Sequence, residues 1–152
     1  MSEASVGLDT NVLVYTVDSQ NAEKCRRAQE LVRLTVATAR GLVALQTVGE
    51  FYAAVTRRGL QSRDAAAQQA RDWLRLFPVV EARFVDVDDA LASAAAGRTS
   101  YWDGMLLATL RRAGCVALLT EDMQDGAVHA GVTIRNPFAG DRLPAEIDAL
   151  LG

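Results

Sequence analysis

The segment Val6-Gly-Leu-Asp-Thr-Asn-Val-Leu-Val-Tyr15 places one acidic residue inside an otherwise apolar stretch. Residues 5–15 alternate and then run apolar, which predicts a buried strand that ends near Asp9 with a turn into Asn11. A carboxylate in such surroundings is costly to bury without a partner. Asp9 is therefore a turn residue or a ligand, and the segment alone leaves both interpretations open.

Short apolar runs alternate with amphipathic patterns along the rest of the chain. Helical spacing predicts helices over roughly 21–39, 47–58, 62–77, 86–97 and 101–113. Apolar runs predict strands at 42–45, 115–119 and, more weakly, 132–134, while 79–85 fits a strand or a loop. The alternation indicates an α/β fold: a single domain over residues 1–152, with a central parallel sheet of four to five strands flanked by helices on both faces.

The composition excludes several classes of protein. The chain has 152 residues, a net charge of −3, one histidine and two cysteines, so a zinc site made of His or Cys lacks ligands. Neither a Gly-x-Ser-x-Gly elbow nor a P-loop occurs. No apolar run reaches the roughly 20 residues of a membrane span, and no signal peptide is recognisable. We expect a cytoplasmic protein in which Cys25 and Cys115 are buried free thiols.

Four acidic residues fall at the ends of predicted elements that meet at one edge of the sheet. Asp9 ends the first strand, Glu50 begins the helix after the second, and Asp122 follows the strand at 115–119. Asp103 opens the helix that leads into that last strand. Ligands of open α/β sheets bind at the carboxyl ends of the strands, so the fold can bring these four acids together.

Each acid also has a purely structural explanation. The segments 47–50 and 100–103 both resemble capping boxes, and Asp122 lies in a polar turn. As a set, however, carboxylates at one edge repel each other and raise their own pKa values. A hard divalent cation such as Mg²⁺ or Mn²⁺ relieves that conflict, and it can activate water and stabilise charge on a phosphoryl group. The set therefore predicts a metal site.

Four stretches resemble the motifs of PIN domains, in the order found in that family. Leu8-Asp-Thr-Asn-Val-Leu-Val-Tyr15 looks like the opening motif, and Gln46-Thr-Val-Gly-Glu-Phe51 resembles the second acidic motif. Ser100-Tyr-Trp-Asp-Gly-Met-Leu-Leu-Ala108 is similar to the third, and Leu118-Leu-Thr-Glu-Asp-Met-Gln-Asp-Gly126 to the last. The resemblance covers roughly residues 4–138 and is strongest to VapC-type toxins of bacterial toxin–antitoxin pairs.

The resemblance implies endonucleolytic cleavage of RNA with Mg²⁺ or Mn²⁺ bound at the carboxylates. It carries over Asp9, Glu50 and Asp103 as metal-site acids, with Asp122 in the last acidic position; whether one or two metal ions act is left open. It further implies a cognate antitoxin as partner and a homodimer, to which the helices at 21–39 and 47–58 could contribute.

Four further residues of these motifs bear on the site. Asn11 matches the family's Asp-Thr-Asn and would orient Asp9, and Thr120 would support the last acid. Glu121 and Asp125 lie close to Asp122 in the chain, so either could take its place at the metal.

Two other functions compete with the nuclease hypothesis. One is a non-catalytic interaction module, in which the acids serve only as caps. The other is an aspartate-nucleophile phosphatase of the haloacid-dehalogenase class, with Asp9 as nucleophile. The second is weak, because Asn11 stands where such enzymes carry a second acid and the only lysine, Lys24, precedes most of the fold.

The sequence also offers groups that could contact RNA. The pairs Arg26–Arg27, Arg57–Arg58 and Arg111–Arg112 are candidates to hold phosphates, although a solvated helix face is the simpler interpretation of any one pair. Trp102 could stack on a base, with a place in the core as the more frequent alternative.

Overall fold

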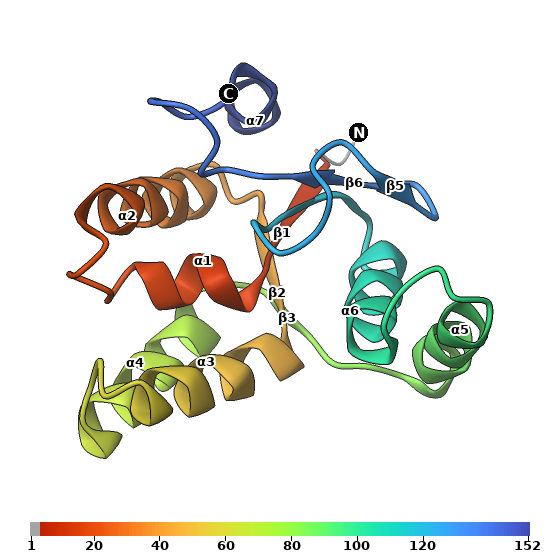
Figure 1. The fold of residues 1–152 in the computed structure, drawn as a ribbon, viewed down its shortest axis with the longest axis horizontal. Coiled ribbons are helices and arrows are strands. Elements are labelled where there is room, and N and C mark those ends of the chain that lie inside the picture. The colour runs from red at the N-terminus through yellow and green to blue at the C-terminus, as the bar shows by residue number, and fades with distance from the viewer. Residues whose placement is uncertain (1–3) are drawn as a thin grey trace.

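The computed structural model describes residues 4–152, which form one twisted sheet between two groups of helices (Figure 1). The strands run in the order β3-β2-β1-β4-β6-β5. All neighbouring strands are parallel except β5 and β6. The strands are β1 (Ser5–Leu8), β2 (Gly41–Ala44), β3 (Val79–Val80), β4 (Cys115–Leu119), β5 (Val128–His129) and β6 (Val132–Arg135).

The predicted α/β class with a parallel sheet between helices is confirmed. The sheet has six strands among the described residues instead of four or five. The additional strands are short: β3 is a two-residue part of the ambiguous stretch 79–85, and β5 is a two-residue edge strand. Strands this short carry no detectable periodicity, so the sequence pattern does not reveal them.

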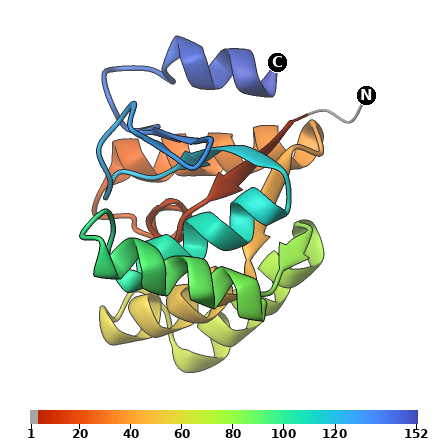
Figure 2. The ribbon, with the colours of Figure 1, turned by 90° about the vertical axis from the view of Figure 1, so that its right-hand side faces the viewer.

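Among residues 4–152, seven helices cover the two faces of the sheet. Helices α1 to α4 and α7 pack on one face, whereas α6 packs on the other with α5 outside it (Figures 1 and 2). The helices are α1 (Thr10–Tyr15), α2 (Ala22–Ala37), α3 (Leu45–Arg57), α4 (Arg63–Leu76), α5 (Phe84–Ala95), α6 (Tyr101–Arg112) and α7 (Ala145–Leu151).

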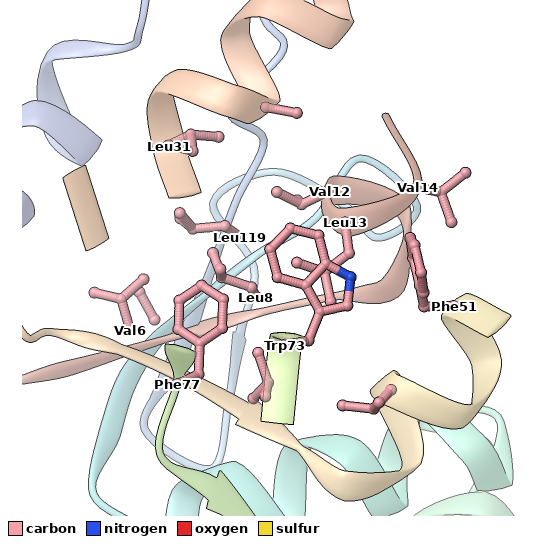
Figure 3. Close-up of a cluster of buried hydrophobic side chains, with 14 of the residues drawn as sticks. Val6, Leu8, Val12, Leu13, Val14, Leu31, Phe51, Trp73, Phe77 and Leu119 are labelled. Carbon is pink, nitrogen blue, oxygen red and sulfur yellow. The ribbon is translucent and has the colours of Figure 1, made fainter. Parts of the chain in front are cut away.

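The alternation of side chains along β1 divides the interior into two cores. Val6 and Leu8 belong to the larger core beneath α1 to α4, in which Phe51 and Trp73 meet edge to face at 5.8 Å (Figure 3). Gly7 faces α6, where a Cβ atom would lie 2.6 Å from the side chain of Leu110. A glycine is therefore needed at this position for α6 to approach the central strand closely.

The largest departure from the sequence prediction follows Asp9. The strand ends at Leu8, as predicted, but residues 10–15 form the short helix α1 instead of a turn. Val12, Leu13 and Val14 of this helix are buried in the larger core. β-branched residues favour strands locally, and burial of this apolar run overrides that preference. Helix α7 was not predicted either.

Helix α3 begins earlier than predicted and removes the capping role considered for Glu50. Strand β2 passes directly into the helix, with Ala44 as the N-cap residue. Thr47 is therefore buried within the helix, and Glu50 is an exposed residue one turn further along. The capping-box interpretation is wrong for Glu50, so its carboxylate is available to the sheet edge.

Both cysteines are free thiols, but only one is buried. Burial raises the pKa of Cys115 to about 12, so this thiol is unreactive. Cys25 is half-buried, contrary to expectation, and its Sγ donates to the carbonyl of Thr16. Within residues 4–152, no helix combines the length and apolar character needed to cross a membrane.

Candidate active site

Asp9 lies at the junction between β1 and α1, where it caps the helix. Its extended backbone lets Oδ1 accept from the Thr10 N–H at 2.7 Å, while Oδ2 accepts from the Thr120 hydroxyl at 2.8 Å. The residue is only 8% exposed. Burial raises the pKa of Asp9 to about 6, and the charges of Asp122 and Glu50 add to this, against the lowering effect of the two hydrogen bonds.

Thr120 and Asn11 connect Asp9 to the loop after β4. Thr120 directly follows this strand, next to β1, so its hydroxyl reaches Asp9 across the sheet edge. Asn11 Nδ2 donates to Thr120 Oγ1 at 2.8 Å and to Asp122 Oδ2 at 3.1 Å. The Asp122 N–H also donates to Thr120 Oγ1 at 3.1 Å. These contacts hold Asp9 and Asp122 on either side of one small polar hub.

Glu50 reaches the same edge from α3. Its Oε2 accepts from the hydroxyl of Thr10 at 2.8 Å, and its Oε1 accepts from Gln46 Nε2 at 2.6 Å. Thr10 therefore joins two acids, because its backbone N–H binds Asp9 and its side chain binds Glu50. The fold thus brings together three of the four predicted acids: Asp9, Glu50 and Asp122.

Asp103 occupies the first turn of α6 and is half-buried. Its backbone N–H donates to Ser100 Oγ at 3.2 Å, which confirms Ser100 as the cap of this helix. Among the described contacts, none joins the Asp103 carboxylate to the other three acids. Its neighbour Trp102, however, lines a groove together with Glu50, which places the start of α6 beside α3.

The structure separates the three acids that compete for the last position. Glu121 accepts from Lys24 Nζ at 2.8 Å and from the Tyr15 hydroxyl, so both of its oxygens are occupied by donors on α1 and α2. Asp125 accepts from the Asn136 N–H at 3.0 Å at the end of β6. Only Asp122 points into the hub with Asn11 and Thr120.

Sequence reasoning missed four residues that shape the site: Thr10, Tyr15, Lys24 and Gln46. Thr10 and Tyr15 belong to α1, which the sequence pattern did not predict as a helix. Lys24 is the only lysine of the chain, and its solitary presence was the one signal in the sequence that could have singled it out. Its contact with Glu121 spans 97 positions, which no local pattern reveals.

The donor chemistry of the cluster fits a hard divalent cation. All the candidate ligands are carboxylate oxygens, which a hard cation prefers. Burial raises the pKa of Asp9, the nearby charges of Asp122 and Glu50 add to this, and a bound cation would favour the charged form. In residues 4–152, no group of three or more Asp, Glu, His or Cys side chains is arranged so that it could hold a metal ion. The reason is visible in the contacts, since Glu50 and Asp122 are turned toward amide and hydroxyl donors.

A cleft of about 260 Å³ adjoins the acids. Asp122 and Glu121 line it together with Asn11 and, on α3, Arg57 and Arg58. The two arginines differ in their bonding. Arg58 pairs at 2.9 Å with the fully buried Asp18, whereas Arg57 is exposed and makes no ion pair among the described contacts.

The other two arginine pairs are divided in the same way. In each pair one guanidinium is used by the fold, and the other lies at the surface. Arg27 donates to three carbonyls of the segment 137–140, and Arg112 pairs with the buried Asp86. The exposed members are Arg26 and Arg111. A double-arginine motif therefore contributes one surface cation here, not two.

The mostly parallel sheet thus carries acids after the carboxyl ends of β1 and β4. A family model described as the PIN domain matches residues 6–124, and the chain belongs to this family. No curated protein sequence matches the chain.

Solved structures share this fold at low sequence identity. A chain of DNA-bound VapBC from Salmonella typhimurium is 16% identical, with a TM-score of 0.63, and the match covers 87% of this chain and 97% of that one. A toxin–antitoxin complex from Klebsiella pneumoniae gives 21% identity, a TM-score of 0.58 and coverage of 85% and 96%. VapC20 of Mycobacterium tuberculosis, a toxin that cleaves the sarcin–ricin loop, is 16% identical with a TM-score of 0.59. That match covers 75% of this chain and 87% of the VapC20 chain.

Proposed function

We propose that this protein is a metal-dependent endoribonuclease and the toxin of a VapBC-type toxin–antitoxin pair. One observation carries the proposal: Asp9 is buried at the carboxyl end of β1, where Thr10 and Thr120 link it to Glu50 and Asp122. Burial raises the pKa of Asp9 to about 6, and the charges of Asp122 and Glu50 add to this. A fold gains nothing from this arrangement by itself, because an uncompensated buried carboxylate destabilises it. Membership of the PIN domain family supports a nuclease.

Mg²⁺ or Mn²⁺ would be held by Asp9, Glu50, Asp103 and Asp122, and when bound it would activate water and polarise the scissile phosphate. The residues of the chain prepare this site. Thr120 and the Thr10 N–H fix the Asp9 carboxylate. Preorganised ligands of this kind bind a cation without further loss of side-chain freedom.

The cleft beside the acids supplies a place for the RNA backbone. Arg57 is exposed there and carries no structural ion pair, so its guanidinium can bind a phosphate. Arg58 neutralises Asp18 and is assigned to the fold. Glu121 lines the same cleft but is paired with Lys24, so the net negative charge that faces the phosphate is lower than the sequence suggests.

The toxin part of the proposal rests on the fold. Chains that share it occur in a toxin–antitoxin complex from Klebsiella pneumoniae and in VapBC of Salmonella typhimurium and Rickettsia felis. By analogy, the partner of this chain is a small antitoxin protein, and a homodimer is the expected assembly. Expression of the chain alone should then arrest growth, and co-expression of the adjacent small reading frame should relieve the arrest. Harmless expression of the wild type would contradict the toxin function.

Cleavage of RNA by the purified protein tests the nuclease function. The wild type should cut single-stranded RNA in Mg²⁺ or Mn²⁺ and be inactive in EDTA, and Asp9→Ala should be inactive in all three. Asp88→Asn is the matched control, because Asp88 is an exposed acid on α5 outside the cluster.

Metal binding is measured separately from activity. Titration calorimetry should detect Mn²⁺ binding to the wild type and to Asp88→Asn, and much weaker binding to Asp9→Ala. Circular dichroism establishes that the variants are folded. If Asp9→Ala binds Mn²⁺ and cuts RNA as the wild type does, the acids serve only as caps and the protein is an interaction module.

A further inference from the structure

Trp102 is exposed at the surface, in a position that packing does not explain. It is the second residue of α6, and 61% of it is exposed, so the expected place in the core is wrong. The indole is nevertheless held in place, because the ring of Tyr101 meets it edge to face at 4.9 Å. Tyr101 in turn contacts the sulfur of Met105 through its hydroxyl. A large aromatic side chain is therefore presented to solvent in a fixed place.

The exposed indole forms one wall of an open groove of about 440 Å³. The other wall is the surface of α3, made of Gln46, Gly49, Glu50 and Ala53. Sites for small molecules fall in a range of about 300–1,000 Å³, so the groove is large enough for a planar base. Glu50 belongs both to this groove and to the acid cluster, where it binds Thr10. The groove is thus continuous with the candidate active site.

Gly49 is a second, independent sign that the groove is kept open. It lies inside α3, where glycine is less favourable than alanine. A Cβ atom built at this position would meet nothing within 4 Å. No close helix packing and no positive φ requires a glycine here, in contrast to Gly7 beneath α6. The absent side chain leaves the α3 wall of the groove, opposite the indole, without a projecting group at this position.

We propose that Trp102 and the Gln46–Ala53 surface of α3 form a base-stacking subsite for an unpaired nucleobase of the RNA substrate, next to the cleavage site. The inference rests on the proposed ribonuclease function and adds the place where a base of the RNA binds. A base must be unstacked and unpaired to enter the groove, so the substrate is single-stranded RNA or a loop. Stacking on an indole is tolerant of sequence, because every base has a π-face.

Binding of RNA can be followed through Trp102 itself. The chain has two tryptophans, and the other, Trp73, is buried in the larger core. A random single-stranded RNA 12-mer is titrated in Ca²⁺, which takes the same oxygen ligands as Mg²⁺. We expect quenching of the exposed tryptophan in the wild type and none in Trp102→Phe, whose remaining indole is shielded. A 12-mer with abasic sites should quench far less, and a fully paired RNA duplex should not quench.

Variants distinguish stacking from general apolar contact. Trp102→Ala and Trp102→Leu should both weaken RNA binding by about 5- to 150-fold, whereas Trp102→Phe should retain part of the affinity. Gly49→Leu should raise the melting temperature and lower RNA affinity, because the new side chain favours the helix and fills the groove. Leu91→Ala truncates another exposed apolar residue, on α5, and should leave binding unchanged.

Each outcome decides the inference apart from the proposed function. RNA binding with quenching but without cleavage in Mg²⁺ or Mn²⁺ would refute the nuclease function and keep the base subsite. Cleavage of RNA by a Trp102→Ala protein that binds RNA with unchanged affinity would refute the base subsite and keep the nuclease function. The inference is also overturned if Trp102→Leu binds RNA as the wild type does. If Trp102→Ala changes only the sedimentation coefficient, the groove is an interface between protein chains.

Discussion

Asp86 on α5 and Asp9 at the end of β1 are both buried, but only Asp86 is paired with a positively charged side chain. Asp86 accepts from Nε and Nη2 of Arg112 at 2.8–3.1 Å and from the Arg83 N–H at 2.8 Å. Burial raises the pKa of Asp86, but these hydrogen bonds and the charge of Arg112 outweigh burial and hold the pKa below its usual 3.8. Asp86 is therefore the acidic partner of an ion pair within the fold.

Asp9 receives only neutral donors and faces two further carboxylates, so its pKa is raised to about 6 by burial and by these charges. Asp18 follows the pattern of Asp86, because Arg58 and Asn21 donate to it. The difference separates an acid that is paired within the fold from one that we propose is left for a ligand. The charge of the first is compensated by a guanidinium, while the second lies near other carboxylates and is costly to keep ionised.

Asp86→Ala tests the structural half of the comparison and should have the largest effect. Removal of the carboxylate leaves Arg112, whose side chain is 25% exposed, without its charged partner at the α5–α6 contact, so the free energy of unfolding should fall by about 1.5–3 kcal/mol. Urea denaturation followed by circular dichroism measures it. Asp88→Ala, on the exposed side of the same helix, should change it by less than about 0.5 kcal/mol. A loss below 1 kcal/mol for Asp86→Ala would show that the pair contributes little.

Asp9→Asn, unlike Asp86→Ala, should leave stability unchanged and reduce the activity on RNA. The substitution keeps the shape of the side chain and removes a charge that has no cation, so metal-free stability at pH 8 should not fall. The activity on RNA, by contrast, should drop by at least about 100-fold, the upper end of what loss of a supporting residue costs. Denaturation in EDTA and cleavage in Mn²⁺ measure the two quantities. If Asp9→Asn is less stable than the wild type, the charge of Asp9 serves the fold, as that of Asp86 does.

Thr120→Val examines the hub behind Asp9 with a smaller change. Valine has the same shape but neither donates to Asp9 nor accepts from Asn11 and Asp122. The affinity for Mn²⁺ and the rate of cleavage should each fall by about 10- to 100-fold, because the ligands lose their orientation. Thr133→Val on β6 is the control. Equal Mn²⁺ affinity in the two variants would contradict a role for the hub.

The pH dependence of stability should reflect both the lowered pKa values of Asp18 and Asp86 and the raised pKa of Asp9. The lowered pKa values of Asp18 and Asp86 mean that the unfolded chain takes up protons first as the pH falls. The stability they contribute is complete above about pH 4 and is lost as the pH falls through their folded pKa values. Asp9 has the opposite sign, so without metal its term lowers stability as the pH rises from 4 to 6. The melting temperature of the metal-free wild type should fall both below about pH 4 and as the pH rises from about 4 to 6. The melting temperature of Asp9→Asn should fall only below about pH 4.

Much of the fold was predictable because its signals are local. Helices α2, α4 and α6 have amphipathic patterns, and each lies within about two residues of its predicted bounds. Pro78 follows α4 and Gly114 follows α6 as predicted, but α2 ends before a turn at Ala39, and Gly41, its predicted stop, begins β2. Helix α1 was missed because its six residues are too few for a period and are rich in β-branched side chains. Edge strand β5 is shorter still.

The candidate site was predictable as a set of acids but not as a geometry. The positions of Asp9, Glu50 and Asp122 after strands placed them at one edge. The capping interpretation of Glu50 failed because β2 enters α3 without a loop. The exposure of Trp102 was not predictable, because an aromatic residue at helical spacing has the same pattern whether it is buried or presented.

The sequence by itself determined the α/β class, the order of the acidic motifs and the family, since these depend on local periodicity and residue type. Only the tertiary structure decided which acids are paired within the fold. Glu121 is paired with Lys24, 97 positions away, whereas Asp122 accepts from the neutral amide of Asn11. Whether a carboxylate is compensated depends on groups within a few ångströms in space, and contacts across a hundred residues leave no mark on the local pattern.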